Sequence, residues 1–360
     1  MLKEIPSLHI LKAFCAFFVI CLHCSFTGRN LIIPIIKIAV PCFYIISGYF
    51  LVDNNGTLVI IRTKKQLRKL VLLSIIANIA YFFFWFFKDD KFFFSIFQLK
   101  TILRICLYGD VLGDQLWFLN AYIEVLLIVL ILEKIKGRVS ISSKYLPLIG
   151  LLLLTAPLFG KYSFLLGRQF NELWFRNVFN IALPFMYVGA MVRKHRERIL
   201  NVLNRKKIWA ILLSLASLSY IEYVIQFYYP QLFLHGDMNI VNIFFPISVF
   251  VACLWHHEYL LESGEDLFHT PPTLCAGCNE TLVAIIKKTM AVCKNWLIGM
   301  GRAHSTNIYL IHFMFVYLFW SIAPGFMERG HPLLPFVVLI LSLLLSAVIN
   351  KTKAVFRKGY

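Results

Sequence analysis

Lys12 and His23 are the two residues whose types and spacing most directly suggest chemistry. Both lie in the first of many apolar segments, and an ionisable side chain inside a membrane span is costly and points to a functional site. Eleven residues at about 100° each place the two on one helix face, roughly 16 Å apart. A cation would then lie near one membrane surface and a proton acceptor well across the bilayer. A reaction that transfers a group across a membrane needs such an arrangement.

The composition indicates that a bilayer surrounds these residues. Of the 360 residues, 59% are hydrophobic and 15% are charged, whereas a soluble domain has about 25% charged residues. The net charge of +18 could indicate a nucleic-acid partner, but the cations lie in short loops between apolar runs, as in inner-membrane proteins. We therefore expect a multi-pass protein of a bacterial cytoplasmic membrane that binds no nucleic acid.

Ten apolar segments are long enough to cross a bilayer. Lysine and arginine concentrate in alternate loops, which predicts that both termini are cytoplasmic and that the first span is not cleaved. We expect one all-α, polytopic membrane bundle over residues 1–360, with about ten transmembrane helices. The predicted spans are 8–27, 32–52, 70–87, 116–132, 145–159, 178–192, 208–229, 240–256, 305–322 and 333–350, of which the fifth and sixth are the shortest.

Two segments depart from this alternation of spans and short loops. The aromatic stretch 92–108 carries cations and is predicted to lie on the membrane surface. The longest loop, 257–304, is predicted to be cytoplasmic and contains an amphipathic stretch at 281–297. Its Cys275 and Cys278 form one Cys-x-x-Cys pair without a second pair, so we expect no metal site.

Further polar side chains fall inside the predicted spans, mostly at a depth similar to that of His23. Each has a structural explanation as well, because lysines can extend to the headgroups and carboxylates can pair with them. Carboxylates have short stems, however, and are the hardest to explain in this way. We expect a polar chamber that includes members of this set: Lys37, Asn120, Glu124, Arg176, Glu222, Asn307 and His312.

Five short motifs, spread over most of the chain, resemble those of the acyltransferase-3 family of integral membrane acyltransferases. Any one of them is weak, but their order on ten spans is specific. Three positions depart from the family pattern: His9 stands where an acid is usual, lysine replaces arginine at 12 and 37, and Gln115 stands where histidine is common. The motifs are Lys12 with Leu22-His23, Lys37 with Pro41 to Phe50, Leu116-Trp117-Phe118-Leu119, Arg176 with Leu183-Pro184-Phe185 and Gly189, and Tyr309-Leu310-Ile311-His312.

The resemblance implies an activity and a set of site residues. The family moves an acyl group, usually acetyl from cytoplasmic acetyl-CoA, onto a hydroxyl of a cell-surface or lipid-linked glycan. By resemblance, His23 is catalytic and Lys12 is its basic companion. Four further motif residues are implied to bind substrate: Ser47, Tyr49, Trp117 and His312.

Acyl transfer to an alcohol requires a base for the hydroxyl proton and a stabilised oxyanion. Histidine titrates near neutrality, so we expect His23 to be the base, with Glu124 orienting its ring. Lys37 or Arg176 would stabilise negative charge or hold the glycan. Direct transfer and an acyl-histidine intermediate both fit.

Acyl-CoA would be a donor substrate rather than a permanently bound cofactor. Its phosphates require cations on the cytoplasmic side. We expect this binding site to comprise Lys12, Arg62, Lys64 and Lys65.

Two other functions fit the same composition. A transporter or flippase for a glycan or lipid-linked sugar would also need charged residues inside many spans, although we find no inverted repeat. The departure at His9 also fits an inactive or accessory membrane scaffold.

Overall fold

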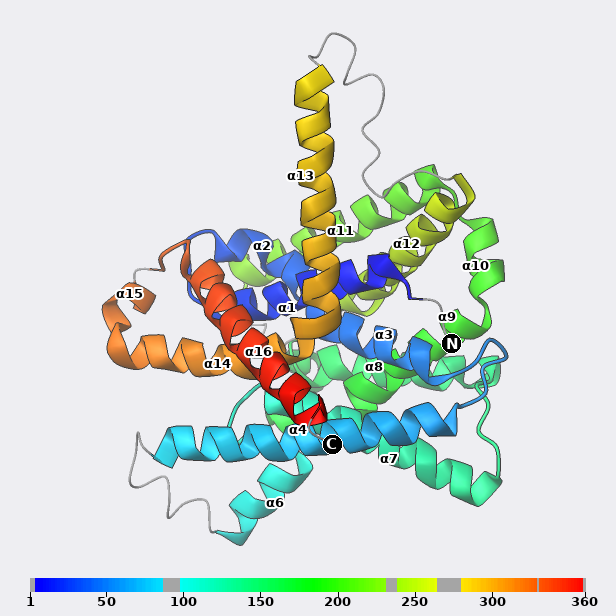
Figure 1. The fold of residues 1–360 in the computed structure, drawn as a ribbon. Coiled ribbons are helices and arrows are strands. Elements are labelled where there is room, and N and C mark those ends of the chain that lie inside the picture. Colours follow the sequence, from blue (N-terminus) through cyan, green and yellow to red (C-terminus); the bar gives the residue numbers. More distant parts are fainter. Residues whose placement is uncertain (1–3, 87–97, 231–237, 264–279, 329, 359–360) are drawn as a thin grey trace.

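The computed structural model describes residues 4–86, 98–230, 238–263, 280–328 and 330–358 (Figure 1). Regular structure in these ranges is helical, apart from two isolated β-bridges. Short π-helical turns, Val178–Ala182 and Met300–His304, lead directly into helices. The α-helices are α1 (Pro6–His23), α2 (Arg29–Ile36), α3 (Ala39–Leu51), α4 (Ile60–Phe86), α6 (Leu99–Leu107), α7 (Leu116–Lys136), α8 (Leu146–Phe159), α9 (Leu183–Lys194), α10 (Arg196–Val202), α11 (Arg205–Tyr228), α12 (Val241–Ser263), α13 (Glu280–Gly299), α14 (Ser305–Ile322), α15 (Pro324–Glu328) and α16 (Leu334–Lys358).

Within the described residues, eight helical segments are long and apolar enough to cross a membrane, and each overlaps a predicted span. The two remaining predicted spans correspond to α8, a shorter apolar helix, and to α9 with its preceding π-turn. The prediction of an all-α polytopic bundle is therefore confirmed. The number of crossings and the side of each terminus stay predictions.

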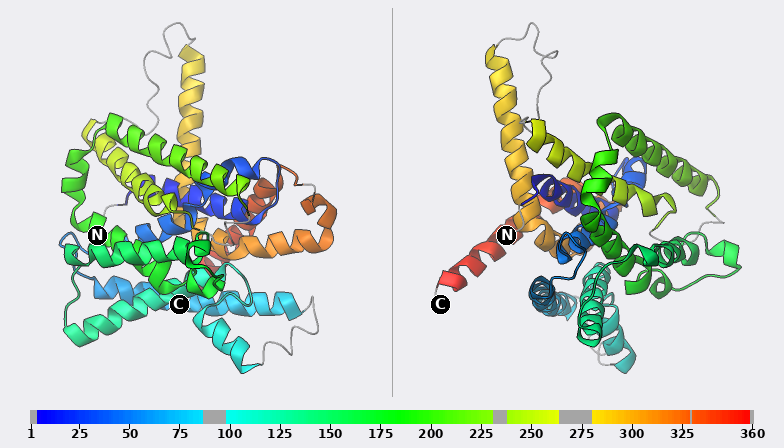
Figure 2. Two further views of the ribbon diagram at one scale, coloured as in Figure 1. Left: turned by 180° about the vertical axis from the view of Figure 1, so that it is seen from behind. Right: turned by 90° about the vertical axis from the view of Figure 1, so that its right-hand side faces the viewer.

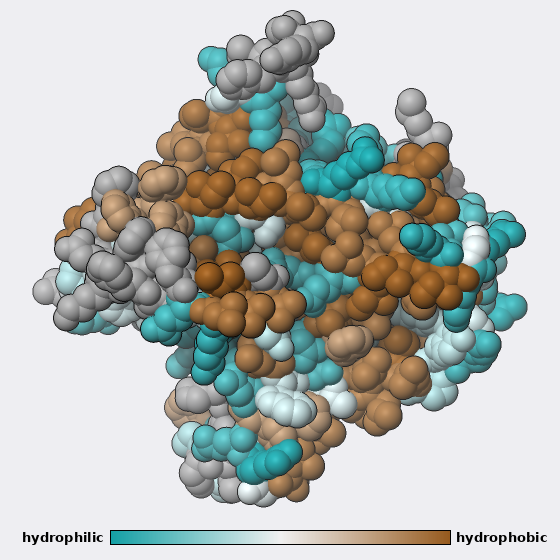
Figure 3. Space-filling view, turned by 90° about the horizontal axis from the view of Figure 1, so that it is seen from below, coloured by the Kyte–Doolittle hydropathy of each residue, from teal (hydrophilic) through white to brown (hydrophobic). Residues whose placement is uncertain are grey.

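The apolar surface of the bundle matches this assignment. Helix α4 exposes a row of large apolar side chains, including Ile75, Ile79 and Phe83. Figure 3 shows apolar side chains over much of the face seen from below. Such a surface is unfavourable in water and favourable against lipid tails.

Loops that the charge pattern assigns to the same side of the membrane lie at the same end of the bundle. At one end, the backbone N–H of Leu58 donates to Val139 O over 3.0 Å, and Lys194 Nζ donates to Ile141 O over 2.6 Å. At the other end, Thr27 N donates to Gly330 O over 2.6 Å. We call the first the cation-rich end, since it includes the loops around residues 60, 138 and 195.

Helices α3 and α9 pack closely against each other, and this contact fixes the position of residues that line the site described below. A Cβ at Gly48 would lie 1.9 Å from Met186 O, and one at Gly189 would lie 2.0 Å from Ile45 O. Only glycine allows two helix backbones to approach so closely. Both glycines belong to the motifs, which assigns them a packing role.

The long predicted loop contains a helix that leaves the bundle. Figures 1 and 2 show α13 projecting from the other helices, roughly crosswise to α4, before the π-turn leads into α14. The predicted amphipathic stretch 281–297 is thus helical. Cys275 and Cys278 lie outside the described residues, as does the first part of the predicted surface segment, whose remainder forms α6.

Candidate active site

Two cavities lie toward opposite ends of α1, which packs among α3, α12, α13, α14 and α16. The outer cavity, of about 320 Å³, opens near the end opposite the cation-rich loops. The inner cavity, of about 200 Å³, lies toward the cation-rich end. His23 lines the outer cavity and Lys12 lines the inner one. The helical spacing of these two residues therefore assigns each to a different cavity.

Charged and polar side chains from four segments line the outer cavity. Lys37 follows α2 and its Nζ lies 3.2 Å from Asn239 Oδ1. Arg176 Nη1 donates to Asp114 Oδ1 over 3.0 Å and to Glu172 Oε2 over 2.8 Å. The cavity thus combines cations with one carboxylate that is already paired. Its lining residues are Val19, Leu22, His23, Arg29, Ile33, Lys37, Val40, Pro41, Asp114, Gln115, Trp117, Arg176, Ile181, Met238 and Tyr309.

A second histidine lies beside His23. The ring centroids of His23 and His312 are 5.4 Å apart, and Phe313 contacts His23 edge-on at 4.6 Å. His312 is fully buried, and its Nδ1 lies 3.1 Å from Ile308 O, which fixes the proton on Nδ1. Its Nε2 has no hydrogen-bond partner among the described residues. That nitrogen is therefore an acceptor close to the His23 ring.

The inner cavity gathers three cations from three separate helical segments. Lys12 comes from α1, Lys69 from α4 and Arg302 from the π-turn before α14. Arg302 Nη1 also lies 3.2 Å from Glu4 Oε2. The π-turn can approach α1 because a Cβ at Gly301 would lie only 1.7 Å from the His9 carbonyl oxygen. Hydroxyl and amide side chains complete the polar wall: Ser47, Gln66, Ser305 and Thr306.

Three aromatic rings contact one another beside the two cavities, and we call them the aromatic layer: Phe43, Phe118 and Tyr309. Phe43 and Phe118 line the inner cavity, whereas Tyr309 lines both cavities. The Tyr309 ring centroid lies 4.8 Å from that of Phe118 and 6.1 Å from that of Phe43. The Tyr309 hydroxyl donates to Gln115 O over 2.9 Å. One side chain therefore borders both cavities.

The family model described as an acyltransferase domain matches residues 5–351, nearly the whole chain. The chain belongs to this acyltransferase family. No curated protein and no solved structure gave a significant match. Membership shows a multi-pass membrane acyltransferase in general terms, and it favours acyl transfer over the transport alternative.

The structure brings most of the predicted residues of this acyltransferase together. His23, Lys37, Trp117 and Arg176 line the outer cavity. Lys12 and Ser47 line the inner cavity. His312 lies behind His23 rather than on the cavity wall, so its geometry fits contact with His23 better than contact with substrate. The roles of all seven residues stay predictions.

Other predicted residues lie apart from both cavities. Tyr49 is buried and its hydroxyl accepts a hydrogen bond from Arg193 Nη1 at 2.9 Å, which indicates a structural role. Glu124 lines neither cavity, so the geometry does not support its predicted orienting of His23. The same is true of three cations predicted to bind acyl-CoA: Arg62, which donates to Phe50 O over 3.4 Å, and the exposed Lys64 and Lys65.

Four charged lining residues and Tyr309 were not among the predicted site residues. The charge pattern of the sequence assigns Arg29 and Asp114 to predicted outer loops and Lys69 and Arg302 to predicted cytoplasmic loops, where charge alone does not show which side chain faces inward. Tyr309 is part of a motif and could have been found from its position three residues before His312. On a helix that spacing places both side chains on neighbouring faces.

Proposed function

We propose that this acyltransferase moves an acyl group, acetyl in the simplest case, from acyl-CoA at the cation-rich end to a glycan hydroxyl at the other end. One observation carries the proposal: two cavities with charged walls lie toward opposite ends of α1, and Tyr309 of the aromatic layer lines both. The cation-rich end would face the cytoplasm. The bilayer would then separate donor from acceptor, and the layer would be the place where the acyl group crosses.

The inner cavity suits the donor. Acyl-CoA carries several phosphate charges, which ammonium and guanidinium groups bind with charge-assisted hydrogen bonds. Lys12, Lys69 and Arg302 supply three such groups on one wall. The thioester end of the narrow pantetheine arm would extend from them toward Tyr309.

The outer cavity suits a sugar acceptor. Its cations and amide groups can bind hydroxyl oxygens, and Trp117 offers an apolar surface for a sugar ring. A cell-surface or lipid-linked glycan would enter from the end opposite the donor. The paired Asp114 leaves Arg176 partly neutralised, so Lys37 and Arg29 are better placed to stabilise the developing oxyanion.

The proposed transfer proceeds by direct attack. The sugar hydroxyl oxygen forms a bond to the thioester carbonyl carbon while His23 takes the hydroxyl proton. The tetrahedral intermediate then collapses, the carbon–sulfur bond breaks, and His23 returns the proton to the departing thiolate. His312 would accept a hydrogen bond from one ring nitrogen of His23, and the other ring nitrogen would act as the base.

Transfer and donor binding can be tested separately on the purified protein. His23→Gln is expected to lower transfer of labelled acetyl from acetyl-CoA by about 10²–10⁴-fold, because the general base is lost, while CoA binding remains. Lys12→Gln is expected to weaken CoA binding, and Lys64→Gln is the matched control on the same charged end. Undiminished transfer by His23→Gln would overturn the assignment of the base. If neither the variants nor the wild type transferred acetyl although the wild type bound CoA, the scaffold alternative would be favoured.

A further inference from the structure

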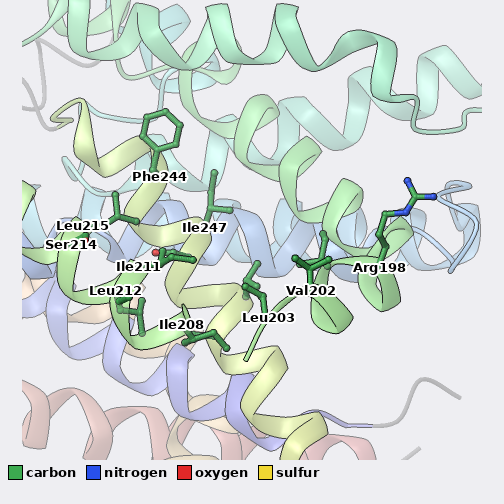
Figure 4. A pocket seen from close by; sticks show the side chains of 15 residues that line it. Arg198, Val202, Leu203, Ile208, Ile211, Leu212, Ser214, Leu215, Phe244 and Ile247 are labelled. Carbon is green, nitrogen blue, oxygen red and sulfur yellow. The ribbon is translucent and has the colours of Figure 1, made fainter. Parts of the chain in front are cut away.

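A further cavity lies away from both polar cavities. It is a groove of about 880 Å³ between α11 and α12, closed at one side by α10 (Figure 4). It shares no lining residue with the outer or the inner cavity. Apart from Arg198 and two serines its wall is apolar: Ile199, Val202, Leu203, Ile208, Ala210, Ile211, Leu212, Leu215, Phe244, Ile247, Val251 and Ala252.

The groove extends over about two thirds of the depth of one bilayer leaflet. On α11 its wall extends from Ile208, near the start of the helix, to Leu215, a rise of about 10 Å. Half of a hydrocarbon core of about 30 Å is about 15 Å. Phe244, which is 55% exposed, lies at the inner limit of the groove. The dimensions therefore fit an acyl chain that enters from the cation-rich end.

The groove carries a charge at its membrane-surface end. Figure 4 shows Arg198 at the end opposite Phe244, with the apolar side chains between them. Its neighbour Arg196 pairs with Glu258, and Arg193 donates to Tyr49. Arg198, in contrast, is exposed and makes no ion pair or hydrogen bond within the described part of the chain.

Further cations surround this end of the groove. Helix α11 begins with Arg205, Lys206 and Lys207, all exposed. The local charge is therefore positive, which attracts anionic headgroups near a membrane surface. Within the groove, the Ser248 hydroxyl donates to Phe245 O over 2.8 Å, so this side chain is satisfied by its own helix.

We propose that this groove is a binding site for one anionic phospholipid of the cytoplasmic leaflet. One acyl chain would lie along Ile208, Leu212 and Val251, and the headgroup phosphate would pair with Arg198. An apolar channel that ends in an unpaired guanidinium is complementary to such a lipid in both shape and charge. The site stands independently of the proposed acyl transfer, because no residue is shared.

Native mass spectrometry of the detergent-purified protein tests this proposal. The protein is titrated with phosphatidylglycerol or phosphatidylcholine of identical acyl chains. We expect the first phosphatidylglycerol adduct to form at about tenfold lower concentration, as one charge-assisted contact allows. Arg198→Gln should remove this preference, and Arg138→Gln, which makes the same charge change in a loop away from the groove, should keep it.

A second variant tests the apolar part of the groove. Ala252→Leu extends a side chain into the groove and should weaken the first adduct of both lipids, while leaving the protein monodisperse. Equal binding of the two lipids by the wild type would overturn the proposal. So would an Arg198→Gln protein that binds phosphatidylglycerol as Arg138→Gln does.

Discussion

Gly48→Ala is the substitution whose effect the structure defines most closely. The new Cβ would lie 1.9 Å from the Met186 carbonyl oxygen, 2.6 Å from its carbon and 2.7 Å from its Cα. All three atoms are backbone, so no side chain can rotate away. Since ordinary Cβ contacts begin at 3.4 Å, α3 and α9 would have to separate by about 1.5 Å at this point.

The expected cost follows from this separation. Overpacking of a close interface destabilises by about 1–3 kcal/mol. Gly150→Ala is the matched control, because a Cβ there meets nothing within 4 Å and the residue lies inside α8. That control should be neutral or stabilising by up to about 1 kcal/mol, as removal of glycine from a helix interior generally is.

Unfolding of the purified variants in mixed micelles measures the change in the free energy of unfolding for Gly48→Ala and for Gly150→Ala. Gly48→Ala should also lose acyl transfer, because Phe43 and Ser47 on the same helix line the inner cavity and would move with it. Gly189→Ala acts on the same interface, so the double variant should cost less than the two single variants together. Equal unfolding free energies for Gly48→Ala and Gly150→Ala would refute the close-packing argument.

Three further predictions concern the proposed site. Tyr309→Ala should open the aromatic layer and raise acceptor-independent release of CoA from acyl-CoA relative to transfer, whereas Tyr309→Phe should not; equal release by both would show that the ring does not separate the cavities. Lys69→Gln and Arg302→Gln should each raise KM for acyl-CoA by about tenfold, with Lys64→Gln unchanged in the same kinetic assay. His312→Ala should lower kcat by about 10–100-fold and shift its pH profile while KM stays constant; an unchanged pH profile would leave His312 a purely structural role.

The spans could be predicted from hydropathy, but helix lengths could not. Helix α4 begins at Ile60, ten residues before the apolar run that marks its predicted span. Its first turns carry Arg62, Lys64, Lys65, Arg68 and Lys69, which are good helix formers outside the hydrocarbon. Apolar composition identifies only the part of a helix that contacts lipid tails. A charged extension of the helix therefore cannot be predicted from hydropathy.

This extension bears on which cations line the inner cavity: Lys12 was among the predicted donor-binding residues, whereas Lys69 and Arg302 were not. On a continuous helix, Arg62, Gln66 and Lys69 share one face, Lys65 lies at the edge of that face, and Lys64 points to the opposite side. The cavity is lined by Gln66 and Lys69, the upper members of that face. With the start of α4 known, helical phase would have excluded Lys64 but not Lys65, which precedes Lys69 by about one turn. It would not have shown which turn reaches the cavity, because that depends on the tilt of α4 against α14.

The position of Lys12 and His23 on one helix face, in contrast, could be predicted, because both lie on one uninterrupted helix whose phase the sequence defines. Which residues lie beside Lys12 and His23 depends on how the other helices pack against α1. The approach of His312 to His23 joins residues almost three hundred positions apart, and no local pattern predicts it. The packing of Gly301 against the His9 carbonyl is equally non-local, since it depends on a π-turn.

Two departures from the family pattern, His9 and Gln115, have contacts that the fold defines. The backbone carbonyl of His9 packs against Gly301, as that of any residue would, and the carboxylate that meets Arg302 comes from Glu4. Where a histidine is common, Gln115 donates through its amide to both Tyr81 Oη and Leu310 O.

The backbone carbonyl of the same Gln115 accepts the Tyr309 hydroxyl. One residue thus ties α4, α7 and α14 together at the aromatic layer. A histidine has one N–H in its neutral form and would satisfy only one of the two acceptors that the amide reaches. The glutamine therefore fits a layer held in place from three helices, and its replacement by histidine should remove the side-chain hydrogen bond to either Tyr81 or Leu310.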